Sequence, residues 1–201
     1  MSDWIGNRKS VYRTIGASSH SEKERETNDY YATDPYAIDV LINDAGANLA
    51  PNIWEVSCGE GHLSKRLEEY GYNVKSTDLI YRGYGVGGID FLTCNDKFDG
   101  DILTNPPYKF AQEFVEHSLE LIPDGRKVFM FLKLTFLEGK KRRKLFDLGC
   151  FKTLYVSTKR ILCAKNGDFE GMKAGGGSAV AYGWYEFEKG YCGNPMIKWI
   201  N

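Results

Sequence analysis

The chain has 201 residues, of which 42% are hydrophobic, so it can bury one sizeable core, and one folded domain is the expected count. Its formal net charge of −1 neither favours nor excludes nucleic acid as a partner. No apolar run approaches the roughly 20 residues that span a bilayer, and the N-terminus lacks the apolar core of a signal peptide, so we expect a cytoplasmic protein without membrane contact.

The N-terminal segment differs in composition from the rest of the chain. Residues 1–29 are polar, with five basic and five acidic side chains, and we predict a mobile arm there. Residues 30–201 are predicted to form the single domain. The five cysteines include no C-x-x-C pair, so we expect reduced structural thiols, with neither a metal site nor a disulfide framework.

After residue 30, short apolar runs typical of buried strands alternate with segments in which apolar residues recur at helical spacing. Helices are predicted over residues 35–44, 62–70 and 109–122. Strands are predicted over residues 52–57, 73–78, 101–104, 127–132, 152–157 and 179–187. This alternation predicts an α/β fold, with a mostly parallel sheet that helices cover on both faces.

A turn with two glycines, Gly59 and Gly61, joins the strand 52–57 to the helix that follows it. Glycines let the backbone approach a ligand closely, and a helix start presents unpaired N–H groups. Asp78 ends the next strand, 19 residues after Gly59, an offset that suits a carboxylate bonded to the two hydroxyls of a ribose. Ser64 stands where the dinucleotide fingerprint has its third glycine, so we expect a nucleoside without a pyrophosphate.

The most informative segment is Asn105-Pro106-Pro107-Tyr108, which follows the strand 101–104. The two prolines fix their own φ angles and bias the preceding residue towards an extended conformation, which holds Asn105 with its carboxamide projecting. A rigid amide acceptor beside an aromatic ring suits a planar, amino-bearing group such as a nucleobase or a carboxamide. Taken alone, a Pro-Pro turn without function explains the segment equally well.

Together, these segments resemble the S-adenosylmethionine-dependent amino-methyltransferases, specifically the adenine-N6 DNA methyltransferases, and most closely their small phage-type members. The resemblance covers about residues 28–200, and residues 105–108 match the N-P-P-Y catalytic motif letter for letter. It implies the Rossmann-like class I methyltransferase fold with a seven-stranded, mostly parallel sheet, and S-adenosylmethionine as cofactor. Val56 departs from the pattern, since many members have proline after the acidic residue of the glycine loop.

The resemblance also implies roles for single residues. The implied catalytic residues are Asn105, Pro106, Pro107 and Tyr108. Thr33 would hold the methionine carboxylate of the cofactor, in the segment that also contains Tyr31. The other implied cofactor residues are Glu55 near the amino group, Ser57, Gly59 and Gly61 in the glycine loop, Asp78 at the ribose, and Asp90 and Phe91 at the adenine.

The predicted site residues fall at one edge of the predicted sheet. The glycine loop, Asp78, Asp90 and Asn105 each lie at or just after the end of a predicted strand. Ligands bind parallel sheets beyond the carboxyl ends of the strands. We therefore expect the four loops to meet in one site.

A basic run follows the predicted strand 127–132. Residues 140–165 contain nine lysines or arginines and a single acid, Asp147. The densest part consists of Lys140, Lys141, Arg142, Arg143 and Lys144. A charge run is usually a solvated helix face, but this one follows a strand at the expected site edge. We therefore predict that these five residues bind the phosphates of the substrate DNA.

Several alternatives stay open at this stage. The same motif serves methyltransferases of protein glutamine, although that family usually carries an N-terminal helical domain that the polar arm cannot supply. An adenine in RNA is a second alternative, and a cofactor-binding module without catalytic activity is a third. The sequence does not distinguish duplex DNA with a flipped adenine from a single strand, and it does not give the oligomeric state.

Overall fold

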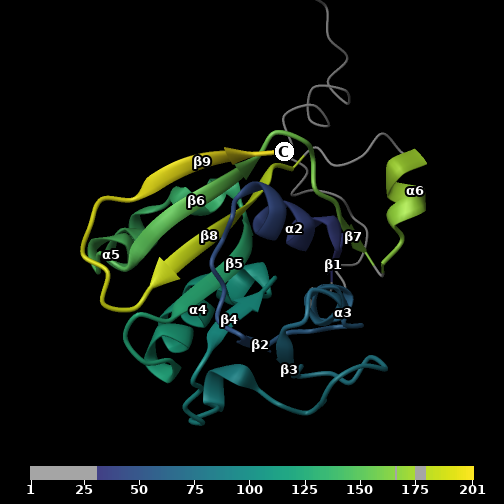
Figure 1. The fold of residues 1–201 in the computed structure, drawn as a ribbon, viewed down its shortest axis with the longest axis horizontal. Helices are drawn as coiled ribbons and strands as arrows, with labels where there is room; N and C mark the ends of the chain where they lie inside the picture. The colour runs from purple at the N-terminus through teal and green to yellow at the C-terminus, as the bar shows by residue number, and fades with distance from the viewer. Residues whose placement is uncertain (1–30, 166, 175–179) are drawn as a thin grey trace, which may run out of the picture.

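The computed structural model describes residues 31–165, 167–174 and 180–201 (Figure 1). The predicted N-terminal arm, residues 1–29, lies outside the described residues. No helix within the described ranges is long and apolar enough to cross a membrane.

A seven-stranded sheet forms the centre of the molecule, with the spatial order β3-β2-β4-β5-β8-β6-β9 (Figure 1). The strands are β2 (Asn52–Glu55), β3 (Asn73–Ser76), β4 (Asp101–Thr104), β5 (Lys127–Lys133), β6 (Phe151–Ser157), β8 (Tyr182–Glu188) and β9 (Met196–Ile200). β8 is antiparallel to both of its neighbours, β5 and β6, and every other neighbouring pair is parallel. The predicted mostly parallel sheet is confirmed, with β8 as the strand that runs the other way.

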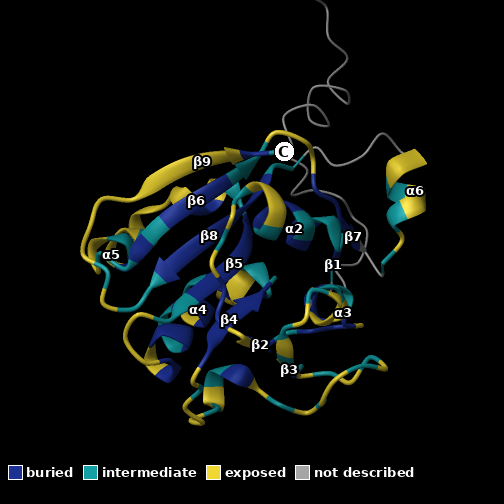
Figure 2. Ribbon diagram, in the orientation of Figure 1, coloured by how far each residue is buried: buried dark blue, intermediate teal, exposed yellow. Residues whose placement is uncertain are grey.

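Helices cover both faces of this sheet, as predicted. Val128, Met130 and Leu132 of β5 belong to the core beneath α4 (Ala111–Leu121) and α5 (Arg143–Asp147). Phe129 and Phe131 belong to the core on the opposite face, beneath α2 (Tyr36–Asp39), the π-helical turn Val40–Asp44 and α3 (His62–Glu69). Figure 2 shows the central strands buried. β5 is a continuous apolar run because both of its faces are covered.

The predicted element boundaries need two corrections at helices. The helix predicted over residues 35–44 is divided into α2 and the π-helical turn. The helix predicted over residues 109–122 begins as a 3₁₀ turn, Tyr108–Phe110, before α4. Each of these segments follows a proline. The fixed φ of proline suits the first turn of a helix, but a proline in the sequence does not show whether that turn is α, 3₁₀ or π.

Three strands were not predicted as such. β1 (Tyr31–Thr33) and β7 (Cys163–Lys165) pair antiparallel in a separate two-stranded sheet, with Thr33 opposite Cys163. β9 forms the outer edge of the large sheet and exposes Met196, Ile197 and Trp199. Three-residue strands are too short to show an alternating pattern, and the apolar residues of β9 are not confined to one face.

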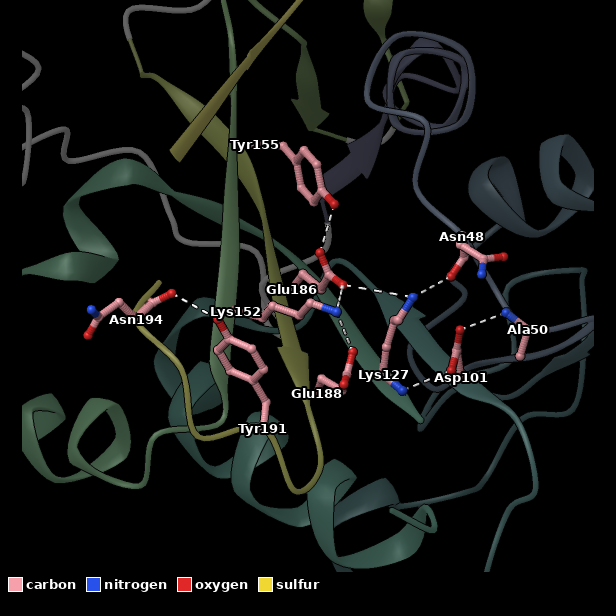
Figure 3. A network of polar contacts seen from close by, with 10 residues as sticks. All are labelled: Asn48, Ala50, Asp101, Lys127, Lys152, Tyr155, Glu186, Glu188, Tyr191 and Asn194. Carbon is pink, nitrogen blue, oxygen red and sulfur yellow. Dashed lines mark hydrogen bonds and ion pairs between the residues drawn. The ribbon is translucent and has the colours of Figure 1, made fainter. Parts of the chain in front are cut away.

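Figure 3 shows a polar network that includes residues of β5, β6 and β8. Glu186 of β8 is 4% exposed and accepts a hydrogen bond from the Tyr155 hydroxyl at 2.7 Å. The ammonium groups of Lys127 and Lys152, near the starts of β5 and β6, each lie 3.9 Å from Glu186 Oε1. A buried charge persists only when it is paired and hydrogen-bonded, so we assign this network a structural role.

Candidate active site

The loops that follow β2 and β4 are joined to each other by hydrogen bonds. Asn105 comes directly after Thr104, the last residue of β4. Ser57 of the glycine loop places its Oγ 2.6 Å from Thr104 Oγ1 and donates to the carbonyl oxygen of Asn105 at 3.1 Å. The glycine loop and the segment 105–108 therefore form one continuous structure at the carboxyl edge of the sheet.

The side-chain amide of Asn105 has a fixed orientation. Its Nδ2 donates to the carbonyl oxygen of Tyr31 at 3.2 Å and to Thr33 Oγ1 at 2.8 Å. Both amide hydrogens are thus used. Asn105 Oδ1 is buried and has no hydrogen-bond partner among the described residues. Leaving a buried acceptor unpaired costs about 1–3 kcal/mol, so this oxygen is placed for a donor that the protein does not itself supply.

Cys163 of β7 lies among the residues that hold Asn105. Its Sγ lies 3.9 Å from Asn105 Nδ2 and 4.0 Å from Thr33 Oγ1. Burial raises the pKa of the Cys163 thiol to about 11, so the thiol stays neutral and serves as a packing and weak hydrogen-bonding group. Sequence reasoning assigned Cys163 no site role, and its short apolar surroundings, Ile161 to Ala164, are the only local signal.

Two side chains contact the ring of Tyr108. Its ring lies 6.0 Å from the Tyr182 ring at an interplanar angle of 30°, and Lys133 Nζ lies 4.9 Å from its centroid. Its hydroxyl donates to Cys163 Sγ at 3.6 Å. Burial raises the pKa of the Tyr108 hydroxyl well above its ordinary value, so the hydroxyl stays protonated and can keep this bond. Asn105 and Tyr108 are therefore held by the same thiol.

Both glycines of the turn adopt left-handed backbone conformations, with φ of +54° at Gly59 and +79° at Gly61. A Cβ at residue 61 would lie 2.2 Å from Cδ1 of Tyr84, a residue of the loop after β3. The space that glycine provides at residue 61 is thus taken by the Tyr84 ring. Gly61 also precedes α3, and His62, the first residue of α3, contacts Phe169 of α6 (Phe169–Ala174) at 5.5 Å between ring centroids.

Asp78 connects the two loops beside the glycine turn. Its Oδ2 accepts from the backbone N–H of Gly59 at 2.8 Å, and its Oδ1 accepts from the backbone N–H of Ile80 at 2.9 Å. A carboxylate can accept about four hydrogen bonds, so two further lone pairs remain for donors outside these loops. Asp78 is half-buried, so its carboxylate is not fully enclosed by the protein.

Glu55, the last residue of β2, is only 2% exposed. It accepts a hydrogen bond from Ser64 Oγ, which in turn lies 2.6 Å from Ser76 Oγ. Burial raises the pKa of the Glu55 carboxyl from its ordinary 4.5 to about 8, and the hydrogen bond from Ser64 offsets only part of that effect. The folded protein therefore keeps this carboxyl protonated at neutral pH.

This raised pKa predicts a pH dependence of folding that Glu55→Gln should remove. The unfolded chain releases the proton above 4.5 and the folded chain only near 8, so stability from this group is present below 4.5 and lost as the pH rises to 8. Urea unfolding at about pH 5 and about pH 7.5 should show the parent losing about 2–3 kcal/mol more than the variant. An equal pH dependence of the two proteins would contradict the raised pKa.

Asp90 and Phe91 occupy different environments. Asp90 is exposed, and its Oδ1 accepts from the backbone N–H of Leu92 at 3.1 Å, which caps the 3₁₀ turn Phe91–Thr93. Phe91 is 2% exposed, and its ring packs in the core 5.6 Å from Trp54 and 5.1 Å from Phe114. The structure therefore gives Asp90 a capping contact and Phe91 a core position.

The basic run divides into exposed and folded-back side chains. Lys140, Lys141 and Lys144 are exposed, and Arg143 pairs with Asp147 at 2.7 Å. Arg142, at the end of the 3₁₀ turn Lys140–Arg142, folds back onto the residues that follow β5. Only Arg142 of this run lines the same hollow as Tyr108.

A cavity of about 720 Å³ lies beside β3. Its lining includes Lys75, Ser76, Thr77 and the loop residues 84–86. None of the predicted site residues lines it. β3 is an edge strand of the sheet, and we do not assign the cofactor to this cavity.

Three solved structures show which known fold this is. The first is named as a class I S-adenosylmethionine-dependent methyltransferase from Listeria monocytogenes, with a TM-score of 0.55, 12% identity, and 82% of this chain and 62% of that chain covered. The second is a modification subunit of a type I restriction enzyme from Vibrio vulnificus, with a TM-score of 0.54, 12% identity, and coverages of 94% and 48%. The third is the type IIG restriction endonuclease BpuSI, with a TM-score of 0.50, 15% identity, and coverages of 74% and 24%.

The fold is that of the class I methyltransferases. The predicted Rossmann-like fold is confirmed, and at these identities the likeness concerns the fold alone. The chain spans less than two thirds of each of the three proteins. No protein-family model and no curated protein matches the sequence. Within the described residues, no group of three or more His, Cys, Asp or Glu side chains could hold a metal ion.

Proposed function

We propose that this protein transfers a methyl group from S-adenosylmethionine to the exocyclic N6 amino group of adenine in DNA. The observation that carries the proposal is Asn105 Oδ1, a buried acceptor without a partner among the described residues, on an amide that Tyr31 and Thr33 hold fixed. An amino group is the donor that such an oxygen requires. The class I methyltransferase fold supplies the setting for a methyl transfer at this edge of the sheet.

The proposed role of Asn105 is to make the amino nitrogen of the substrate more nucleophilic. The lone pair of an exocyclic amino group is delocalised into its ring, which makes the nitrogen a poor nucleophile. Asn105 Oδ1 and the carbonyl oxygen of Pro106 would each accept one N–H bond, which favours pyramidal nitrogen and stabilises its developing positive charge. Because Nδ2 is already bonded, the oxygen needs no reorientation when substrate arrives.

Several residues fit the proposed cofactor, which supplies an activated methyl group on its sulfonium when bound. The Asp78 carboxylate keeps two free lone pairs for the ribose hydroxyls after bonding Gly59 and Ile80. Ser57 and the positive-φ Gly59 place the glycine loop against the 105–108 segment. The proposed cofactor site also includes Tyr31, Thr33, Glu55, Gly61, Asp90 and Phe91. Tyr31 and Thr33 also accept hydrogen bonds from the Asn105 amide.

Tyr108 would hold the adenine by stacking. In a duplex the target base must first be flipped out of the helix, which costs a few kcal/mol that stacking partly offsets. The ring of Tyr108 is fixed by Tyr182 and by the Cys163 thiol, so it offers a rigid platform. A single-stranded substrate would need the same platform without the cost of flipping.

DNA is the favoured substrate for two reasons. The exposed lysines of the basic run are neighbours in sequence of Arg142, which lines the same hollow as Tyr108. Two proteins with the same fold are, by their names, parts of restriction-modification systems. Methylation of a glutamine side chain or of RNA adenine would use the same Asn105 oxygen, so substrate classes must be compared directly.

Transfer of a radiolabelled methyl group from S-adenosylmethionine tests the proposal. The purified protein is offered equal masses of plasmid DNA, total RNA and a protein extract. We expect label in DNA, and none above background in the other two. Label in protein alone would support the glutamine alternative, label in RNA alone would support the RNA alternative, and no label with any substrate would contradict an enzymatic role.

The basic run provides a separate prediction about DNA binding. Replacing the exposed Lys140, Lys141 and Lys144 with alanine spares Arg142, whose side chain supports the local fold. For duplex DNA, every lysine–phosphate pair that the substitution removes should reduce the slope of log affinity against log salt by about 0.9. We expect the triple variant to bind every DNA sequence more weakly, with a flatter salt dependence and unchanged affinity for the cofactor.

A control variant, Lys97→Ala with Lys198→Ala, removes a lysine of the loop before β4, whose ammonium bonds the carbonyl of Glu120, and a lysine of β9. It should keep the slope of the parent. If the triple variant also kept that slope, the basic run would be a solvated face and not a DNA contact. Titration of each protein with one duplex at several salt concentrations supplies the comparison.

A further inference from the structure

A small hollow lies beside Tyr108. Its volume is about 50 Å³, and its lining is Tyr108, Ala111, Leu132, Lys133, Thr135, Phe136 and Arg142. This is more than the roughly 30 Å³ that one water occupies in the liquid and far below the roughly 300 Å³ or more of a pocket for a whole small-molecule ligand. The hollow therefore suits a small group and not a base.

The lining has two cationic side chains and no acidic one. Lys133, the last residue of β5, is half-buried, and its Nζ contacts the Tyr108 ring at 4.9 Å. Among the described residues, its ammonium contacts this ring and no carboxylate. An ammonium is stabilised less by an aromatic face than by an ion pair. An anion that entered the hollow could therefore form an ion pair with Lys133.

Arg142 is fixed in place as the second cation. Its Nη1 donates to the carbonyl oxygens of Thr135, Phe136 and Glu138, and its guanidinium lies 4.7 Å from the Phe136 ring. The bonds described for the guanidinium all come from Nη1, which leaves the Nε and Nη2 hydrogens for a ligand. A guanidinium held by three carbonyl oxygens is preorganised for phosphate.

We propose that Lys133 and Arg142 bind the phosphate group attached to the flipped adenosine, while its base stacks on Tyr108. The inference rests on the proposed function and names a substrate contact within it. Tyr108 both lines the hollow and belongs to the catalytic segment, so a nucleotide with its base on this ring carries its own phosphate close to the hollow. Lys133 then positions the target nucleotide, whereas the exposed Lys140, Lys141 and Lys144 contact the backbone elsewhere.

Phosphate neutralisation combined with mutation tests this positioning role. The site that the parent methylates is first mapped on plasmid DNA and placed in synthetic duplexes. Two of these carry a neutral methylphosphonate on the 5′ or the 3′ side of the target adenosine, and a third carries it several nucleotides away. Single-turnover methylation is measured for the parent, Lys133→Met, Lys133→Arg and the control Lys97→Met, whose ammonium bonds the carbonyl of Glu120 at the far end of α4.

We expect one methylphosphonate next to the adenosine to slow the parent about tenfold or more, the scale expected for the loss of a hydrogen bond to a charged group. On natural DNA, Lys133→Met should methylate about as slowly as the parent does on the modified duplex. The adjacent methylphosphonate should not slow this variant further. Lys133→Arg should recover most of the rate, and Lys97→Met should behave as the parent. Cofactor affinity and melting temperature should be the same in all four proteins.

Two results would overturn the inference while leaving the proposed function intact. One is a Lys133→Met protein as fast as the parent on natural DNA. The other is a Lys133→Met protein that methylates natural DNA slowly and that the adjacent methylphosphonate slows by the same factor as it slows the parent. A purely structural role of Lys133 would give this result, because it would leave the phosphate effect unchanged. A parent protein that methylates no DNA would instead refute the proposed function, and this inference with it.

Discussion

Asn105→Ala should reduce methyl transfer by a hundredfold or more, because it removes the acceptor that is preorganised for the amino group. The variant also loses the two hydrogen bonds from Nδ2 to Tyr31 and Thr33. At the same time it removes Oδ1, a buried acceptor whose unpaired state costs about 1–3 kcal/mol. These effects oppose each other, so the melting temperature should change little.

The measurement is single-turnover methylation with saturating cofactor, together with calorimetry of cofactor binding and a thermal melt. Asn73→Ala is the matched control, since Asn73 is exposed on β3 and its side-chain amide donates to Asn52 Oδ1 at 3.3 Å. It should keep the full rate. An Asn105→Ala protein that is folded, binds cofactor and methylates as fast as the parent would show that the amide does not activate the substrate.

Asp78→Ala should weaken cofactor binding by about 1–3 kcal/mol, which is about a 5- to 150-fold rise in Kd, because two ribose hydroxyls would lose their acceptor. The same change frees the backbone N–H groups of Gly59 and Ile80. Part of the loss can therefore come from a loosened glycine loop rather than from the missing ribose contact.

Two companion variants separate these causes. Asp78→Asn keeps one oxygen acceptor and removes the charge, so it should fall between the parent and Asp78→Ala in isothermal calorimetry. Asp124→Ala, at an exposed turn before β5, should bind as the parent does. Removing the 2′ and 3′ hydroxyls of the cofactor should weaken binding by the parent but not binding by Asp78→Ala, which has no ribose contact left to lose. A parent that binds the 2′,3′-dideoxy cofactor as tightly as the natural cofactor would refute the ribose contact.

The sheet and one half of the candidate site were accessible from the sequence because their signals are local. Buried strands such as residues 127–132 are continuous apolar runs, and the prolines after Asn105 define a strand end. The join between the glycine loop and the 105–108 segment follows from the rule that parallel strands present their carboxyl ends together. The structure shows this join as the Ser57–Asn105 hydrogen bond.

The other half of the candidate site depends on contacts between residues that are far apart in the chain. The Asn105 amide is held by Thr33, 72 residues away, and lies beside Cys163, 58 residues away. These partners come from strands of three residues, which are too short for a periodic pattern to reveal. Gly61 shows a further limit, since its sequence context indicates ligand approach while its open space is filled by the Tyr84 ring. Only tertiary packing decides which use a glycine serves.

The identity of the methylated atom tests the central claim most directly. DNA incubated with the protein and isotopically labelled S-adenosylmethionine is digested to nucleosides and analysed by mass spectrometry against authentic standards. The proposed role of Asn105 Oδ1 predicts labelled N6-methyldeoxyadenosine with the parent protein and its loss with Asn105→Ala. Label on a ring carbon or a ring nitrogen, or N6-methyldeoxyadenosine formed equally by both proteins, would contradict it.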